Sequence, residues 1–194
     1  MSTIATAGRA PDFADPLLGW RTWCVSERPG GLLALTSVVR EVAWPVRTAL
    51  RAECLRPTWR WWSKRRRGEH AVPERGCECG IYAAANVAQA LTYFDAYDGA
   101  VQRRAPVVLG VVKLWGTVLQ CERGWRAACA YPSRLFVVAP SKRRDLQPEA
   151  LAAGLERYGV PVDVLDTSEA SVIDLLVARD QRVAFQAPPL PRGR

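Results

Sequence analysis

Two apolar runs separated by a short polar turn constrain the fold of this chain most. Residues 106–119 are dominated by Val, Leu and Trp, and residues 125–131 continue that character after Glu122-Arg123-Gly124. β-Branched and aromatic residues favour extended backbone, and a short turn containing glycine favours an antiparallel return. The sequence therefore predicts a hairpin formed by 107–119 and 125–131, which excludes an all-helical fold.

A second turn lies nearer the N-terminus. Arg28-Pro29-Gly30-Gly31 separates a strand-like run over 20–25 from another over 32–39. Proline and glycine at these positions are typical of turns, so we expect a second hairpin. Residues 46–55 fit either a third strand or a short helix.

Helical periodicity follows in two places. Residues 81–97 carry apolar side chains at helical spacing after an alanine-rich start, and we expect a helix there. Residues 147–158 predict another helix, with Pro148 in its first turn and Gly159 as its C-terminal cap. Short apolar runs at 135–139 and 160–165 flank this second helix. The order strand, helix, strand predicts a parallel crossover.

Composition agrees with an ordinary globular domain. The chain has 194 residues, of which 49% are hydrophobic and 24% are charged. These values exclude a largely disordered chain, a collagen-like chain and a coiled coil. The longest stretch without charge, 79–94, is 16 residues long, shorter than the roughly 20 residues that span a bilayer. No apolar block of signal-peptide length opens the chain, so we expect a cytoplasmic protein without a transmembrane segment.

One group of side chains has the composition of a metal site. Cys54, His70, Cys77 and Cys79 supply three thiols and the only imidazole in the chain. Thiolate and imidazole ligands in this number complete a tetrahedral zinc site. Gly76 and Gly80 give the backbone the freedom to turn around the Cys-x-Cys pair. Because all four positions are filled, we expect a structural zinc site and not a catalytic one.

Two alternatives remain open for these residues. They can be ordinary buried cysteines beside a solvated histidine, or they can serve disulfide or redox chemistry. The other three cysteines (Cys24, Cys121 and Cys129) lie in expected strands. We interpret those three as small apolar core residues.

With the metal site included, the elements predict an α+β fold. A mainly antiparallel sheet or small β-barrel would occupy residues 19–139 and carry an inserted zinc knuckle and helix. A C-terminal α/β extension over 140–186 would pack on it. Polar and proline-containing composition predicts a mobile lead-in over 1–18 and an extended tail over 187–194.

Three runs carry a resemblance to known sequences. They are GCECGIYAAANVAQAL (76–91), VVKLWGTVLQCERGWRAACAYPSRLFV (111–137) and ERYGVPV (156–162). Together they resemble a family of small actinobacterial proteins with a His…Cys-x-Cys-Gly-Ile-Tyr-Ala segment and a Gly-Trp/Tyr-Arg-Ala…Ala-Tyr-Pro segment. The resemblance implies that the Cys/His set occurs together, and it implies no particular activity.

Positive charge is concentrated in one segment. Residues 56–67 hold six cations and no acid, which leaves +2 of the net charge of +8 to the remaining 182 residues. Arginine and lysine neutralise phosphates, and exposed indoles stack on unpaired bases. Interfacial membrane contact and a solvated loop are the alternatives. The candidate nucleic-acid contacts are Arg56, Arg60, Trp61, Trp62, Lys64, Arg65, Arg66 and Arg67, together with Lys142, Arg143 and Arg144.

The sequence offers little for catalysis. A single histidine excludes chemistry that needs two, and no phosphate-binding glycine motif follows an expected strand. We therefore predict a non-enzymatic, zinc-stabilised, nucleic-acid-binding accessory protein. A module that docks an acidic protein partner is the main alternative. A small enzyme remains a third, and a pocket lined by Tyr82, Tyr131 or Arg126 would favour it.

Overall fold

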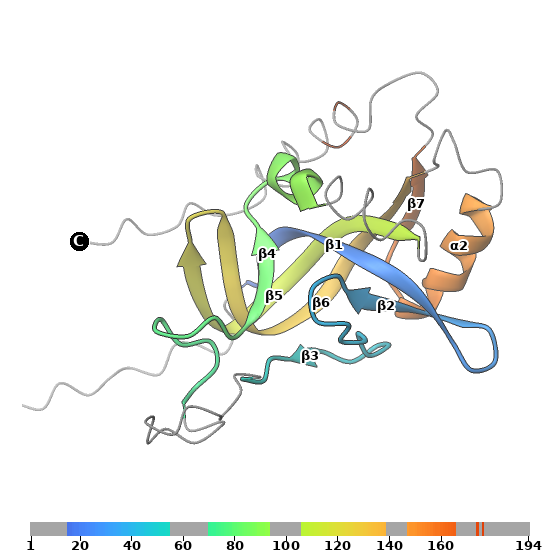
Figure 1. Cartoon of the computed structure of the whole chain (residues 1–194). Coiled ribbons are helices and arrows are strands. Elements are labelled where there is room, and N and C mark those ends of the chain that lie inside the picture. The colour runs from blue at the N-terminus through green and yellow to red at the C-terminus, as the bar shows by residue number, and fades with distance from the viewer. Residues whose placement is uncertain are drawn as a thin grey trace, which may run out of the picture.

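A computed structural model describes residues 15–54, 70–93, 106–138 and 147–165, together with 174 and 176. Most of the predicted lead-in, the predicted tail, the basic segment at 56–67 and the triplet at 142–144 lie outside the described residues. The structure is of the α+β class and consists mainly of one sheet (Figure 1).

The long central hairpin is confirmed. Strands β5 (Val107–Cys121) and β6 (Gly124–Val138) pair antiparallel along their whole length. The prediction that 135–139 forms a separate strand is wrong, because β6 runs straight through Pro132. The register shifts between Val111 and Val112, opposite Pro132. The proline, which has no N–H to donate, therefore lies where the regular ladder of hydrogen bonds is already interrupted.

Strands β1 (Leu17–Arg28) and β2 (Leu32–Ser37) form the second predicted hairpin. β1 begins two residues before the start expected for the ordered domain, and its other edge pairs with β5. Of the two possibilities for 46–55, the structure has a strand, β3 (Leu50–Arg51), on the edge of β6.

The predicted helix over 81–97 is wrong at its start. Ile81–Ala84 forms strand β4, which pairs with residues 124–127 of β6 and touches β1 at Trp20. Helix begins only at residue 87 and continues to 93, and residues 94–97 lie outside the described part. An exposed strand edge on β6 supplies backbone partners that outweigh the local helix propensity of the alanines.

The C-terminal crossover is confirmed. Helix α2 (Pro148–Leu155) and the short 3-10 helix η1 (Glu156–Tyr158) precede Gly159, whose φ of 69° caps the helical segment. Strand β7 (Val162–Leu165) then pairs parallel with β6 and so extends the same sheet.

The strands form one curled sheet and not the closed barrel given as an alternative. β4 meets β1 at a single residue pair, Trp20 with Ala84, which is too short a ladder to close a barrel. Side chains alternate between two cores. Trp23, Leu35 and Leu114 pack with α2 on one side, while Trp20 and Leu109 pack with residues of the 87–93 helix on the other. In the described part of the chain, no helix combines the length and apolar character needed to cross a bilayer.

Candidate metal centre

The metal-ligand candidates converge because β3 and β4 meet on one edge of β6. β3 pairs with β6 at residues 129–130 and the Ala52 N–H then donates to the Ala128 carbonyl, so the chain reaches Cys54 beside residues 126–128. β4 begins at the same level, where Ile81 pairs with Ala127. The segment with Cys77 and Cys79 therefore approaches this part of β6 from the β4 side, and Cys54 approaches it from the β3 side.

The four donor atoms are close enough to surround one ion. One atom from each of Cys54, His70, Cys77 and Cys79 lies within 4.8 Å of the others. The Cys54 and Cys77 Sγ atoms are 3.7 Å apart. In a tetrahedral site with Zn–S bonds of about 2.3 Å, two sulfur atoms are about 3.8 Å apart. The predicted residues thus form a potential metal-binding site whose spacing fits a single tetrahedral ion.

His70 completes the set. Its Nδ1 lies 4.0 Å from the Cys79 Sγ atom and 2.9 Å from the carbonyl oxygen of Ala71. The hydrogen bond to Ala71, followed by smaller contributions from Cys77 and Glu74, raises the pKa of the imidazole. A metal ion at Nδ1 would replace the proton that this nitrogen shares with the Ala71 carbonyl.

The surroundings favour a thiolate at Cys77. Burial by itself would raise the pKa of this thiol. Hydrogen bonds to the Cys79 backbone and to the side chains of Cys54, Cys79 and His70 outweigh burial and lower the pKa to about 7. Burial, together with the neighbouring Cys77, raises the pKa of Cys79. Cys77 is therefore the first of the two to ionise, and ionised sulfur is the form that binds metal.

Arg126 on β6 holds the segment that carries two of the ligands. Its Nη1 donates to the carbonyl oxygens of Cys77 and Cys79, the latter at 3.2 Å, and its Nη2 donates to the Glu74 carbonyl at 3.5 Å. Its Nε donates to the Cys121 sulfur at 3.4 Å. The residue is only 8% exposed. A cation at this place also offsets the negative charge of neighbouring thiolates.

Some of the other residues singled out from the sequence lie in the described part of the chain, and others do not. None of the eleven candidate nucleic-acid contacts, which run from Arg56 to Arg67 and from Lys142 to Arg144, falls within the described residues. Cys24 and Cys129 are buried in strands as expected, whereas Cys121 is only half-buried. Tyr82 lines a large groove and Arg126 a smaller recess next to the ligands, but the Tyr131 hydroxyl is instead bonded to the Tyr158 carbonyl.

Sequence reasoning did not assign Arg126 to the metal centre, although one signal was present. Arg126 stands between Trp125 and Ala127 in an otherwise apolar strand, where a charged side chain needs a specific partner. Its partners are backbone carbonyls far away in the sequence, and residue types do not reveal such contacts.

Comparisons with protein-family models, with curated proteins and with solved structures found no match to this chain.

Proposed function

We propose that this chain is a zinc-stabilised, non-enzymatic nucleic-acid-binding protein that works in the cytoplasm. The observation that carries the proposal is the position of the ligand candidates relative to the basic segment. Cys54 immediately precedes residues 55–69 and His70 immediately follows them. An ion bound by both residues would therefore close the base of the segment that holds the Trp/Arg cluster.

The donor set supports zinc as the metal. Three sulfur atoms and one imidazole nitrogen suit zinc better than magnesium or calcium, which prefer oxygen ligands. Four protein ligands leave no open coordination position, so the ion would have a structural role. None of the six cysteines, all of which lie within the described residues, forms a disulfide, which fits a reducing compartment such as the cytoplasm.

Charge and aromatic content support nucleic acid as the partner. The segment combines six cations with Trp59, Trp61 and Trp62. Cations that bind phosphates release counterions, and indoles stack on unpaired bases for about 1–3 kcal/mol each. Fixing both ends of the segment on one ion would lower the entropy lost when it binds a strand.

The test measures binding of a fluorescent single-stranded oligonucleotide at several salt concentrations. Changing Lys64, Arg65, Arg66 and Arg67 together to Ala should reduce the slope of log K against log salt by up to about 3 units, since each phosphate contact contributes about 0.7 on a single strand. Four exposed cations outside the segment provide a matched control with the same loss of charge: Arg28, Arg40, Lys113 and Arg123. The control should leave the slope nearly unchanged.

Two further arms distinguish the alternatives. Trp61→Ala should weaken single-strand binding more than duplex binding, because only unpaired bases offer a free face. If polyglutamate or heparin binds as tightly as the oligonucleotide, and Trp61→Ala has no effect, an acidic protein partner is favoured instead. Absence of salt-sensitive binding to DNA and RNA at low ionic strength would overturn the proposal.

A further inference from the structure

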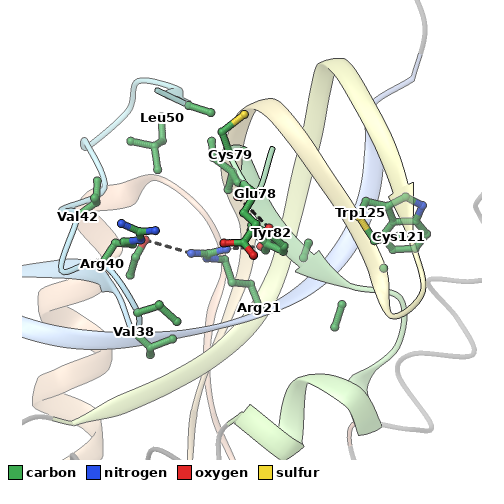
Figure 2. Close-up of a pocket in the computed structure, with 18 of the residues that line it drawn as sticks. Arg21, Val38, Arg40, Val42, Leu50, Glu78, Cys79, Tyr82, Cys121 and Trp125 are labelled. Carbon is green, nitrogen blue, oxygen red and sulfur yellow. Dashed lines mark hydrogen bonds between the residues drawn. The ribbon is translucent and has the colours of Figure 1, made fainter. Parts of the chain in front are cut away.

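A large groove lies beside the metal centre, between the turn that follows β2, the strand β3 and the strand β4. Its volume is about 990 Å³, within the range of about 300–1,000 Å³ that is typical of small-molecule sites. Figure 2 shows Val38, Val42 and Leu50 on one side and Tyr82 on the other, with Arg21 between them.

The groove collects exposed apolar side chains. Among the described residues, five large hydrophobic side chains are exposed, and three of them line this groove: Val39, Tyr82 and Tyr93. Val39 is the most exposed of the five, at 66%. Large apolar side chains gathered in one concave place indicate a surface that is covered when a ligand binds.

Arg21 places a cation in the interior of this apolar groove. Its Nη1 donates to the Tyr82 carbonyl oxygen and its Nη2 to the Ser37 hydroxyl at 3.0 Å. The guanidinium carbon lies 5.1 Å from the centre of the Trp44 ring. The Nε atom is buried and has no partner. A guanidinium has five N–H donors, so these contacts leave more than half of its donors unused.

No carboxylate neutralises this cation within the described part of the chain. Burial lowers the pKa of Arg21 to about 10, and no neighbouring charge contributes to the shift. The group is still a cation at neutral pH. The groove also has charged residues of both signs, Arg40, Arg51 and Arg123 against Glu53, Glu78 and Glu122. Those charges balance each other in number, whereas Arg21 is a half-buried cation without an acidic partner among the described residues, and an anionic ligand would stabilise it.

We propose that the groove binds a small molecule that has an apolar body and one carboxylate. The carboxylate would accept hydrogen bonds from the free Arg21 donors. The apolar body would lie along Val38, Val42 and Leu50 and cover Tyr82. This site is separate from the basic segment, so the proposal does not depend on nucleic-acid binding.

The test uses a fluorescent fatty acid, 11-(dansylamino)undecanoic acid, and its methyl ester, which keeps the body and removes the charge. The wild-type chain should bind one equivalent of the acid and bind the ester at least about tenfold more weakly, since the ester cannot form a charge-assisted hydrogen bond with Arg21. Arg21→Met should weaken binding of the acid by a similar factor and leave binding of the ester unchanged.

Arg40→Met is the matched control, because Arg40 lines the same groove but is exposed. It should change the affinity for the acid less than about twofold, as expected for a solvent-screened charge. Equal affinity of the wild-type chain for acid and ester would overturn the proposal, as would an Arg21→Met variant that binds the acid normally. If Arg21→Met does not fold, the comparison of acid and ester on the wild-type chain decides the outcome alone.

Discussion

Replacing Arg126 by Met should weaken the binding of Zn²⁺, the metal proposed for the candidate site, about 10- to 100-fold. The guanidinium donates to the carbonyl oxygens of Cys77 and Cys79, two of the ligand candidates. Methionine fills similar space but cannot donate, so both carbonyls lose their partner. Outer-shell groups that fix metal ligands are typically worth 10- to 100-fold in affinity, or about 1.4–2.8 kcal/mol.

The number of carbonyls that lose their partner also limits the total free energy lost in Arg126→Met. A buried polar group left without a partner costs about 1–3 kcal/mol, so two carbonyls cost about 2–6 kcal/mol. The share of this free energy that does not appear as lost metal affinity should appear as lower stability of the metal-free protein. Subtracting the roughly 1.4–2.8 kcal/mol of lost metal affinity leaves about 0.6–3.2 kcal/mol, which lowers the melting temperature of a chain of this length by about 1–13 °C.

The assay combines a competition titration of Zn²⁺ against a chromophoric chelator with thermal unfolding of the metal-free protein. Arg134→Met is the matched control, because Arg134 lies on the same strand and is exposed. It pairs with Asp163 at 2.6 Å, and an exposed pair of this kind is worth about 1 kcal/mol or less. Arg134→Met should therefore leave zinc affinity unchanged.

Arg126→Lys separates charge from geometry. Lysine keeps the positive charge, but its single nitrogen cannot replace Nη1, Nη2 and Nε, which together bond the carbonyls of Cys77, Cys79 and Glu74 and the Cys121 sulfur. We therefore expect only partial recovery. Wild-type zinc affinity together with a normal melting temperature in Arg126→Met would refute the reasoning. It would mean that the hydrogen bonds from Arg126 contribute nothing to holding the ligands.

Three further changes test the centre and the fold. Cys54→Ser should lower the zinc content of the purified protein well below one per chain, as measured by elemental analysis, while Cys24→Ser in β1 should not. Gly124→Ala should destabilise the fold by about 3 kcal/mol or more, because the added Cβ would lie 2.0 Å from the Ala83 carbonyl oxygen at a φ of 148°. Denaturant unfolding would measure this loss, and Gly76→Ala, where nothing lies within 4 Å, should be nearly neutral. Tyr158→Phe should cost about 1–3 kcal/mol in the same experiment, because its hydroxyl accepts from the Leu35 N–H and donates to the Trp44 carbonyl; an unchanged midpoint would contradict the role of this hydroxyl.

The elements that the sequence alone determined are those governed by neighbours along the chain. The β5–β6 and β1–β2 hairpins follow from turn residues and from β-branched runs, and Gly159 ends its helical segment as expected. These features depend on backbone preferences within a few residues. The identity of the four ligand candidates was likewise visible, because few side chains supply sulfur or imidazole.

Only the tertiary structure decided how these parts meet. Ile81–Ala84 became a strand because β6 offers an edge about 40 residues later in the chain, a pairing that no local pattern contains. The same edge, by pairing with β3 and β4 at adjacent levels, brings Cys54 to Cys77. Arg21 and Arg126 acquire their hydrogen bonds in the same way, from carbonyl groups contributed by strands and loops distant in sequence. Residue types can specify chemistry, but the position of a distant backbone carbonyl is a property of the folded chain alone.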